Sequence, residues 1–136
     1  MPTDPPVSLW PNPDALGTLT DLYEITMMAG YAGAGMDQAH ATFELFVRRL
    51  PAGRAYLVFA GLEQALGDLL KMAFSAEQVD AFRSWPNFSR IDPGFFDRLK
   101  ELRFTGEVWA VREGSVVFPG EPLVRIEAPL LQAQWI

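Results

Sequence analysis

The sequence has no cysteine and only one histidine. Without cysteine, disulfide bonds, thiolate nucleophiles and cysteine-ligated metal sites are excluded. The single histidine, His40, stands apart from other candidate ligands, so a metal site or catalytic triad built within this chain is not expected. We expect His40 on the surface or at a strand edge. No metal-binding residue is predicted.

Positive charge is also scarce. The 11 lysines and arginines face 17 aspartates and glutamates, which gives a net charge of −6. The basic residues do not cluster, so neither nucleic acid nor an anionic membrane surface is an expected partner. No apolar run approaches the roughly 20 residues that cross a bilayer, and the N-terminus lacks the order of a secretory signal. The expected location is the cytoplasm.

Familiar catalytic spacings are missing as well. Neither the dinucleotide-binding glycine pattern nor the P-loop pattern occurs. The acidic residues are scattered, without the pairing typical of a glycosidase or a carboxylate metal site. Spacing alone therefore identifies no catalytic centre.

The composition that remains is that of a folded protein. The 136 residues are 49% hydrophobic and 21% charged, which fits one domain. Five prolines in residues 1–18 predict an extended, poorly ordered leader, and residues 19–136 form the predicted domain. The apolar run at 130–136 has no polar tail. We interpret the chain as truncated at residue 136.

The segment Leu19–Tyr31 predicts a helix that is apolar on nearly all sides and therefore buried. Thr20 or Asp21 is expected to cap its start, and Asp21 with Glu24 forms a loose capping-box pattern. Tyr23 lies in the first turn, where free backbone N–H groups attract anions. From this segment alone, a core or interface role for the Tyr23 ring is favoured over a binding role.

Beyond this segment, alternation and helical periodicity predict both strands and helices. Ser75 with Gln78 forms a capping box, and Asp92-Pro93 is a typical helix start. The expected helices begin at residues 62, 75 and 92. The expected strands are 41–47, a buried strand at 55–60, and short strands at 107–111, 115–118, 123–127 and 130–136. Because helices and strands are segregated along the chain, the predicted fold class is α+β, with a small sheet or half-barrel.

Three arginines flank the turn at 51–53, namely Arg48, Arg49 and Arg54. Guanidinium groups match phosphate and carboxylate in a bidentate way, so this turn is a candidate anion site. The alternative is a solvated strand end whose arginines pair with acidic residues. Taken alone, the spacing favours the alternative.

Five motifs occur in a fixed order along the chain. They are Leu-Thr-Asp-Leu-Tyr-Glu-Ile-Thr-Met at 19–27, Phe-Glu-Leu-Phe-Val-Arg-Arg-Leu-Pro at 43–51, Ala-Gly-Leu at 60–62, Asp-Pro-Gly-Phe-Phe at 92–96 and Glu-Gly-Ser-Val-Val-Phe-Pro-Gly-Glu-Pro-Leu at 113–123. Together they resemble the N-terminal part of nicotinate phosphoribosyltransferase, a type II phosphoribosyltransferase family. The resemblance runs from about residue 18 to the last residue.

The resemblance implies an enzyme of NAD salvage. Such an enzyme joins nicotinate to phosphoribosyl pyrophosphate and forms nicotinate mononucleotide and pyrophosphate. ATP hydrolysis is coupled through a phosphorylated histidine, so Mg²⁺ and ATP are implied for the full-length enzyme, which has the character of a ligase. The fold is an N-terminal α+β domain with a hammerhead-like sheet, packed on an incomplete α/β barrel, and the active site lies at the interface of a homodimer.

The resemblance also implies roles for single residues. Tyr23 corresponds to a tyrosine that stacks on the pyridine ring of nicotinate, which orients the substrate. Asp21 is expected in the same site, capping the helix or holding an arginine, because a bare carboxylate repels nicotinate. Arg48 or Arg49 is the candidate contact to a substrate phosphate. No catalytic residue is expected in this chain, and His40 precedes the wrong element to be the phosphorylated histidine.

The α/β barrel of the family is absent from the chain, so the predicted fragment has no activity and binds no cofactor by itself. A nicotinamide-specific relative is the nearest alternative, although the run at 43–51 favours the nicotinate branch. A non-catalytic interaction or dimerisation module derived from the family is the other alternative.

Overall fold

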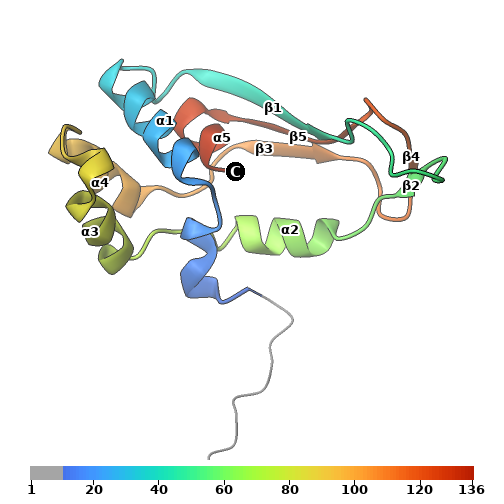
Figure 1. Ribbon diagram of the computed structural model, residues 1–136, viewed down its shortest axis with the longest axis horizontal. Coiled ribbons are helices and arrows are strands. Elements are labelled where there is room, and N and C mark those ends of the chain that lie inside the picture. The colour runs from blue at the N-terminus through green and yellow to red at the C-terminus, as the bar shows by residue number, and fades with distance from the viewer. Residues whose placement is uncertain (1–10) are drawn as a thin grey trace, which may run out of the picture.

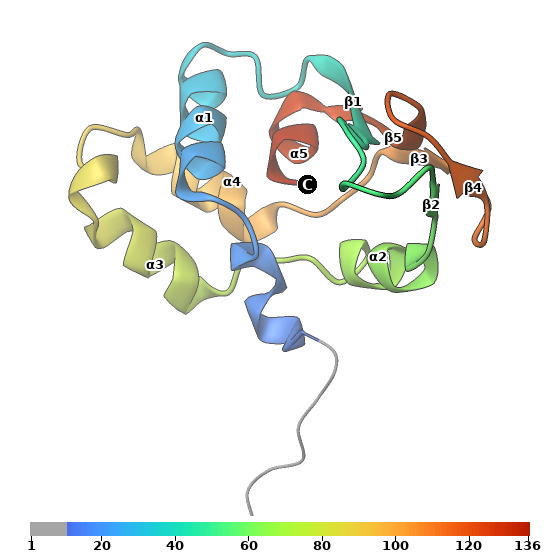
Figure 2. The same cartoon turned by 45° about the vertical axis from the view of Figure 1, so that its right-hand side comes forward.

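The computed structural model describes residues 11–136. In chain order, its elements are the 3₁₀ helix η1 (Pro13–Thr18), α1 (Leu22–Gly33), β1 (His40–Phe46), β2 (Leu57–Val58), α2 (Leu62–Leu69), α3 (Ala76–Ser84), the 3₁₀ helix η2 (Pro86–Phe88), α4 (Pro93–Glu101), β3 (Glu107–Ala110), β4 (Val116–Val117), β5 (Pro122–Pro129) and α5 (Leu130–Trp135). Helices α1, α3 and α4 gather at one end, β2 and β4 lie at the other, and α2 lies below the sheet (Figures 1 and 2). No helix in the described range is long and apolar enough to cross a bilayer.

The main sheet has three antiparallel strands in the order β1-β5-β3. Phe43 is opposite Ile126 of the central strand, and Ile126 is opposite Val108. Side chains alternate between the faces of a strand, so these three residues share one face. A second, two-stranded sheet pairs β2 with β4. Segregated helices and small antiparallel sheets confirm the predicted α+β class.

The hydrophobic core lies at the helical end of the molecule. It is formed by side chains of α1, α3, α4, α5 and the segments between them, namely Ile25, Met28, Ala29, Phe74, Val79, Phe82, Phe88, Phe95, Phe96, Leu99, Leu102, Leu131 and Trp135. Phe74 stacks on Trp135 with their ring centroids 4.7 Å apart. The indole Nε1–H of Trp135 donates to the Gly17 carbonyl at 2.9 Å, which ties the C-terminal helix to η1.

The predicted helix caps are confirmed for α3 and α4 but not for α1. Ser75 and Gln78 form both hydrogen bonds of a capping box at the start of α3. The Asp92 side chain accepts from the Gly94 N–H at 2.8 Å at the start of α4. At α1, Asp21 is the N-cap residue but makes no capping hydrogen bond with its side chain. Instead, the Thr20 hydroxyl donates to the Glu24 carboxylate, so the loose capping box is not formed.

The predicted leader differs from the structure over its last residues. Residues 1–10 of the predicted leader lie outside the described range. Residues 13–18 form η1, in which the Asn12 side chain accepts from the Asp14 N–H and Leu16 is buried. The Gly17 position packs against the backbone of Ala73. These six residues therefore belong to the fold rather than to a poorly ordered leader, because apolar contacts outweigh the effect of proline on local order.

Two predicted strands are wrong in type or extent. Residues 130–135 form α5, not a strand. This helix is buried at Leu130, Leu131, Ala133, Gln134 and Trp135, so burial on nearly all sides left no period that distinguishes a helix from a strand. The predicted buried strand at 55–60 reduces to Leu57–Val58. Val58 is 55% exposed, since this segment pairs only with β4 at the end of the molecule. An apolar run cannot be buried where no second layer covers it.

Candidate functional site

Tyr23 is the exposed aromatic residue at the start of α1. Its side chain is 57% exposed, on the side of the helix opposite the buried residues Ile25 and Met28. The prediction that α1 is apolar and buried on nearly all sides is therefore wrong for this face, which also exposes Leu22 and Met27. A ring placed here is available to a ligand or a partner rather than to the core of this chain.

The Tyr23 hydroxyl is held by its neighbour. It donates to Oε1 of Glu24 at 3.2 Å. This hydrogen bond, together with the negative charges of Glu24 and Asp21, raises the pKa of the Tyr23 hydroxyl above its ordinary value. The phenol is therefore neutral in the range where most enzymes work, and its ring offers an uncharged face for stacking.

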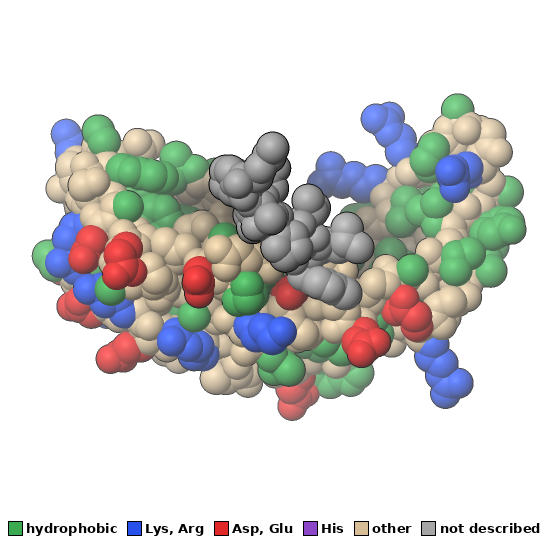
Figure 3. Space-filling view, turned by 90° about the horizontal axis from the view of Figure 1, so that it is seen from below, with side chains coloured by type: hydrophobic (Ala, Val, Ile, Leu, Met, Phe, Trp, Pro, Cys, Tyr) green, Lys and Arg blue, Asp and Glu red, His purple; other side chains and the backbone are tan. Residues whose placement is uncertain are grey.

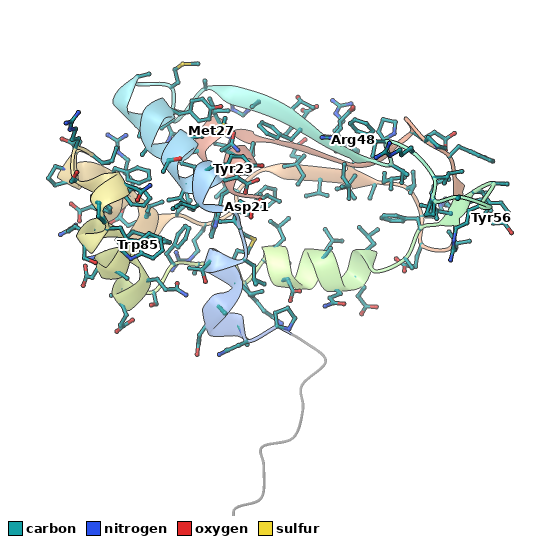
Figure 4. All side chains as sticks on the ribbon, in the orientation of Figure 1. Asp21, Tyr23, Met27, Arg48, Tyr56 and Trp85 are labelled. Atoms are coloured by element: carbon teal, nitrogen blue, oxygen red, sulfur yellow. The ribbon has the colours of Figure 1, made fainter. Side chains whose placement is uncertain are left out.

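Asp21 lies beside Tyr23, at the N-cap of α1 (Figure 4). The side chain is exposed and makes no capping hydrogen bond. The structure thus brings Asp21 and Tyr23 together at one helix end, where free backbone N–H groups favour a negative charge.

The structure does not bring the predicted arginines to this site. Arg48 and Arg49 follow the end of β1 and are exposed. Figure 4 shows Arg48 toward the β2–β4 end of the sheet, away from Tyr23. In the same region, the turn at 51–53 uses Gly53 with φ +78°, a conformation that favours glycine. Within one copy of this chain, Tyr23 and the arginines therefore form two separate candidate sites.

The β2–β4 end is itself an exposed aromatic and basic surface. Figure 3 shows exposed hydrophobic side chains and several basic ones at this end of the molecule. The exposed large hydrophobic residues there are Tyr56, Val58, Val116 and Phe118. Exposed aromatic residues beside arginines are typical of binding surfaces.

A groove of about 480 Å³ lies between the main sheet and α2. The sheet wall includes Phe43, Val108 and Ile126, and the helix wall includes Leu62 and Leu66. Leu19 and Glu24 also line it, so it adjoins the start of α1, although Tyr23 is not one of its lining residues. The strand alternation at 41–47 predicted an apolar face. The sequence contains no signal that this face borders a groove instead of a filled core.

No group of three or more carboxylate or imidazole side chains within residues 11–136 is arranged to hold a metal ion. Because Mg²⁺ is usually held by one or two carboxylates together with substrate phosphates, this observation assigns no metal-binding role to any described residue. What the arrangement can do is bind: it offers an exposed ring, a helix N-terminus and an apolar groove.

Comparison with known proteins gives one consistent result. The family profile of the nicotinate phosphoribosyltransferase (NAPRTase) N-terminal domain matches residues 18–136. The chain is 41% identical over 117 residues to nicotinate phosphoribosyltransferase pncB2 of Mycobacterium tuberculosis, covering 86% of this chain and 24% of the relative. It is 40% identical over 123 residues to nicotinate phosphoribosyltransferase of Bacillus subtilis, covering 90% of this chain and 24% of the relative.

A solved structure gives the same result in three dimensions. The fold is similar to the crystal structure of human nicotinic acid phosphoribosyltransferase, with a TM-score of 0.78 and 40% sequence identity. The similarity covers 86% of this chain and 23% of the human chain. This chain thus spans about a quarter of the length of the curated relatives it matches. The matched part is the N-terminal domain, and the described residues 11–136 contain no α/β barrel.

Proposed function

The chain belongs to the nicotinate phosphoribosyltransferase family, and on this premise we propose that it serves as the N-terminal domain of an enzyme of NAD salvage. The proposed reaction joins nicotinate to phosphoribosyl pyrophosphate, gives nicotinate mononucleotide and pyrophosphate, and is coupled to ATP hydrolysis. The observation that carries the proposal is the match of the family's N-terminal domain to residues 18–136.

Within this reaction, the proposed role of Tyr23 is to stack on the pyridine ring of nicotinate. Its exposure and its place in the first turn of α1 support this role. Stacking adds roughly 0.5–1.5 kcal/mol beyond burial, which orients a substrate but performs no chemistry. Asp21 is proposed to shape the same helix end. Because Arg48 lies away from Tyr23, a phosphate-binding role for Arg48, or for Arg49 next to it in the chain, requires the rest of the enzyme or a second subunit.

The remaining parts of the machinery are proposed to lie outside this chain. In this proposal, the rest of the full-length enzyme supplies the phosphorylated histidine, the sites for Mg²⁺ and ATP, and the barrel that completes the active site. The family resemblance supports a cytoplasmic homodimer with a shared site. It follows that the 136-residue chain alone has no phosphoribosyltransferase activity, because charge stabilisation at the migrating ribosyl group needs residues that it lacks.

The first experiment incubates the purified chain with nicotinate, phosphoribosyl pyrophosphate and Mg-ATP, and measures nicotinate mononucleotide. We expect none above a protein-free control. Product formation that scales with the amount of chain across independent purifications would contradict the proposed inactivity.

A chimera tests whether residues 18–136 serve as the N-terminal domain of an active enzyme. Residues 18–136 replace the matching segment of the Mycobacterium tuberculosis pncB2 relative, to which they are 41% identical over 117 residues. We expect the chimera to form nicotinate mononucleotide and to prefer nicotinate over nicotinamide. A folded chimera without activity would favour the alternative of a non-catalytic interaction module. A preference for nicotinamide would favour the nicotinamide-specific alternative.

In the same chimera, Tyr23→Ala is expected to raise KM for nicotinate or lower kcat/KM by about 5- to 150-fold, a loss of roughly 1–3 kcal/mol. Tyr23→Phe keeps the ring and is expected to be mild. Trp109→Ala is the matched control, because Trp109 is an exposed aromatic residue (47%) of β3, outside α1 and outside the β2–β4 end. Equal losses for nicotinate and phosphoribosyl pyrophosphate, with a lowered melting temperature, would assign Tyr23 a structural role instead.

A further inference from the structure

Glu113 connects two distant parts of the chain. Its carboxylate accepts two backbone hydrogen bonds, from the Gly61 N–H to Oε1 at 2.6 Å and from the Leu62 N–H to Oε2 at 3.0 Å. These donors are the N-cap and first residues of α2, while Glu113 lies in the turn between β3 and β4. Figure 1 shows this turn beside the start of α2.

Helix α2 has no cap of its own. Its N-cap residue is Gly61, which has no side chain and adopts φ +98°. The first N–H groups of a helix have no partner within the helix, and an anion placed there also interacts favourably with the helix dipole. Hydrogen bonds to a charged acceptor are stronger than neutral ones. Glu113 therefore supplies from a distance the cap that other helices obtain from a neighbouring serine or aspartate.

The backbone around Glu113 fixes its position. Val58 pairs with Val116, the Phe59 N–H donates to the Ser115 carbonyl at 2.9 Å, and the Gly114 N–H donates to the Phe59 carbonyl at 2.8 Å. Gly114 has φ +80°, which allows the tight turn. The chain leading into α2 and the turn that carries Glu113 thus form one hydrogen-bonded unit.

Helix α2 is not packed directly on the sheet. The groove of about 480 Å³ separates the two, and its helix wall includes Leu62, Ala65 and Leu66. Leu69, in the last turn, is the only residue of α2 that is buried. The C-terminal end of α2 is therefore anchored by burial, while its N-terminal end is held by the two hydrogen bonds to Glu113.

We propose that Glu113 is a positioning residue that holds α2 over the apolar face of the sheet and sets the width of the groove. Without its carboxylate, α2 pivots about Leu69 and the groove widens. The inference concerns the position of one helix and does not depend on nicotinate binding.

Amide hydrogen exchange on the 136-residue chain tests this proposal. The isosteric variant Glu113→Gln is expected to accelerate exchange at residues 66–69 by about tenfold or more, and to leave β1 and β5 within about threefold of the unmodified chain. These α2 amides do not touch Glu113, so they report on the whole helix. Glu63→Gln is the matched control, because Glu63 lies in the first turn of α2 and is exposed. It is expected to change exchange by about threefold or less.

A distance measurement follows the helix directly. The chain has no cysteine, so spin labels on Gln64→Cys of α2 and Glu107→Cys of β3 are the only labels present. Dilution with unlabelled chain removes distances between molecules. We expect a narrow distance distribution with Glu113 intact and a longer, broader one with Glu113→Gln.

Three results would overturn the proposal. The first is an unchanged exchange rate or unchanged distance distribution in Glu113→Gln. The second is an equal effect of Glu63→Gln, which indicates a general charge effect. The third is acceleration in β1 and β5 as large as in α2, or loss of folding, which assigns Glu113 a role in global stability.

Discussion

At the scale of single residues, Gly17 is a position where the fold leaves no room for a side chain. A Cβ at this position would lie 2.2 Å from the Ala73 carbonyl oxygen, a backbone atom that cannot turn aside. The same glycine supplies the carbonyl that accepts from the Trp135 indole. A small residue here is therefore required by contacts between segments more than 50 residues apart.

Gly17→Ala is expected to lower the free energy of unfolding by about 2 kcal/mol, because η1 must move away from Ala73. Gly67→Ala is the matched control: Gly67 lies within α2, and a Cβ there meets nothing within 4 Å. This control is expected to stabilise the chain by up to ~1 kcal/mol, since alanine favours the helix. Urea unfolding of both variants measures the difference. Equal stability of the two would contradict the packing argument.

Tyr23 gives a second prediction at this scale. The hydrogen bond to Glu24 favours the neutral phenol and so raises the pKa of Tyr23 above its ordinary value of 10.0. The contribution of this hydrogen bond to folding stability is therefore fully present below the ordinary pKa of tyrosine. It is lost as the pH rises through the raised pKa of Tyr23. Phenolate absorbance, taken as the difference between the unmodified chain and Tyr23→Phe, isolates this group. Glu24→Gln is expected to lower the pKa of Tyr23; an unchanged titration would mean that the hydrogen bond is not formed in solution.

At the scale of elements, α3 begins with the most complete local signal in the chain. Ser75→Ala removes the acceptor of the Gln78 N–H and is expected to cost about 1 kcal/mol. The backbone N–H of Glu77 and the Ser75 hydroxyl lower the pKa of the Glu77 carboxyl group. The ionised carboxylate therefore contributes to folding stability above the ordinary pKa of glutamate, and this contribution is lost as the pH falls through the lowered pKa of Glu77. Ser84→Ala is the control, because the Ser84 hydroxyl donates only to the Ala81 carbonyl near the end of α3. Similar costs for both variants in thermal unfolding would contradict a specific capping role.

The same element shows why part of the fold was predictable. The starts of α3 and α4 depend on residues within three positions of each other, so the sequence was sufficient there. Residues 130–135 were predicted as a strand because an apolar run fits either a buried strand or a buried helix, and only packing against α1 decides between them. The cap supplied by Glu113 had no local signal at all, since its donors lie 51 and 52 residues away.

The candidate site, like the fold, was predictable from the sequence only in part. The exposure of Tyr23 was not predictable, because the apolar sequence around it indicated a helix buried on nearly all sides. Its candidate role came from the resemblance of an ordered set of motifs, not from spacing. The groove was missed because the apolar faces of β1 and α2 looked like ordinary core faces, and their separation is a property of the tertiary fold.

At the scale of the whole molecule, the buried core and the exposed apolar surface lie in different regions. The core occupies the helical end, whereas the groove beside α2 and the outer face of α1 leave large apolar side chains exposed. Leu45, in the sheet wall of the groove, is 59% exposed. Contiguous apolar surface of this kind favours association, which the net charge of −6 only partly opposes.

We therefore expect the 136-residue chain to self-associate at micromolar concentration, with the groove as the main contact. Leu45→Lys places a charge in the groove and is expected to weaken association by about tenfold, because one leucine side chain is then no longer buried in the contact. Leu70→Lys is the matched control, because Leu70 is 78% exposed, is absent from the groove lining and carries the same change of charge when substituted. Sedimentation velocity over a concentration series measures all three proteins. If the two lysine variants weaken association equally, the effect comes from net charge and not from the groove. If the unmodified chain is monomeric, the chain covers this apolar surface itself and does not need a partner to do so.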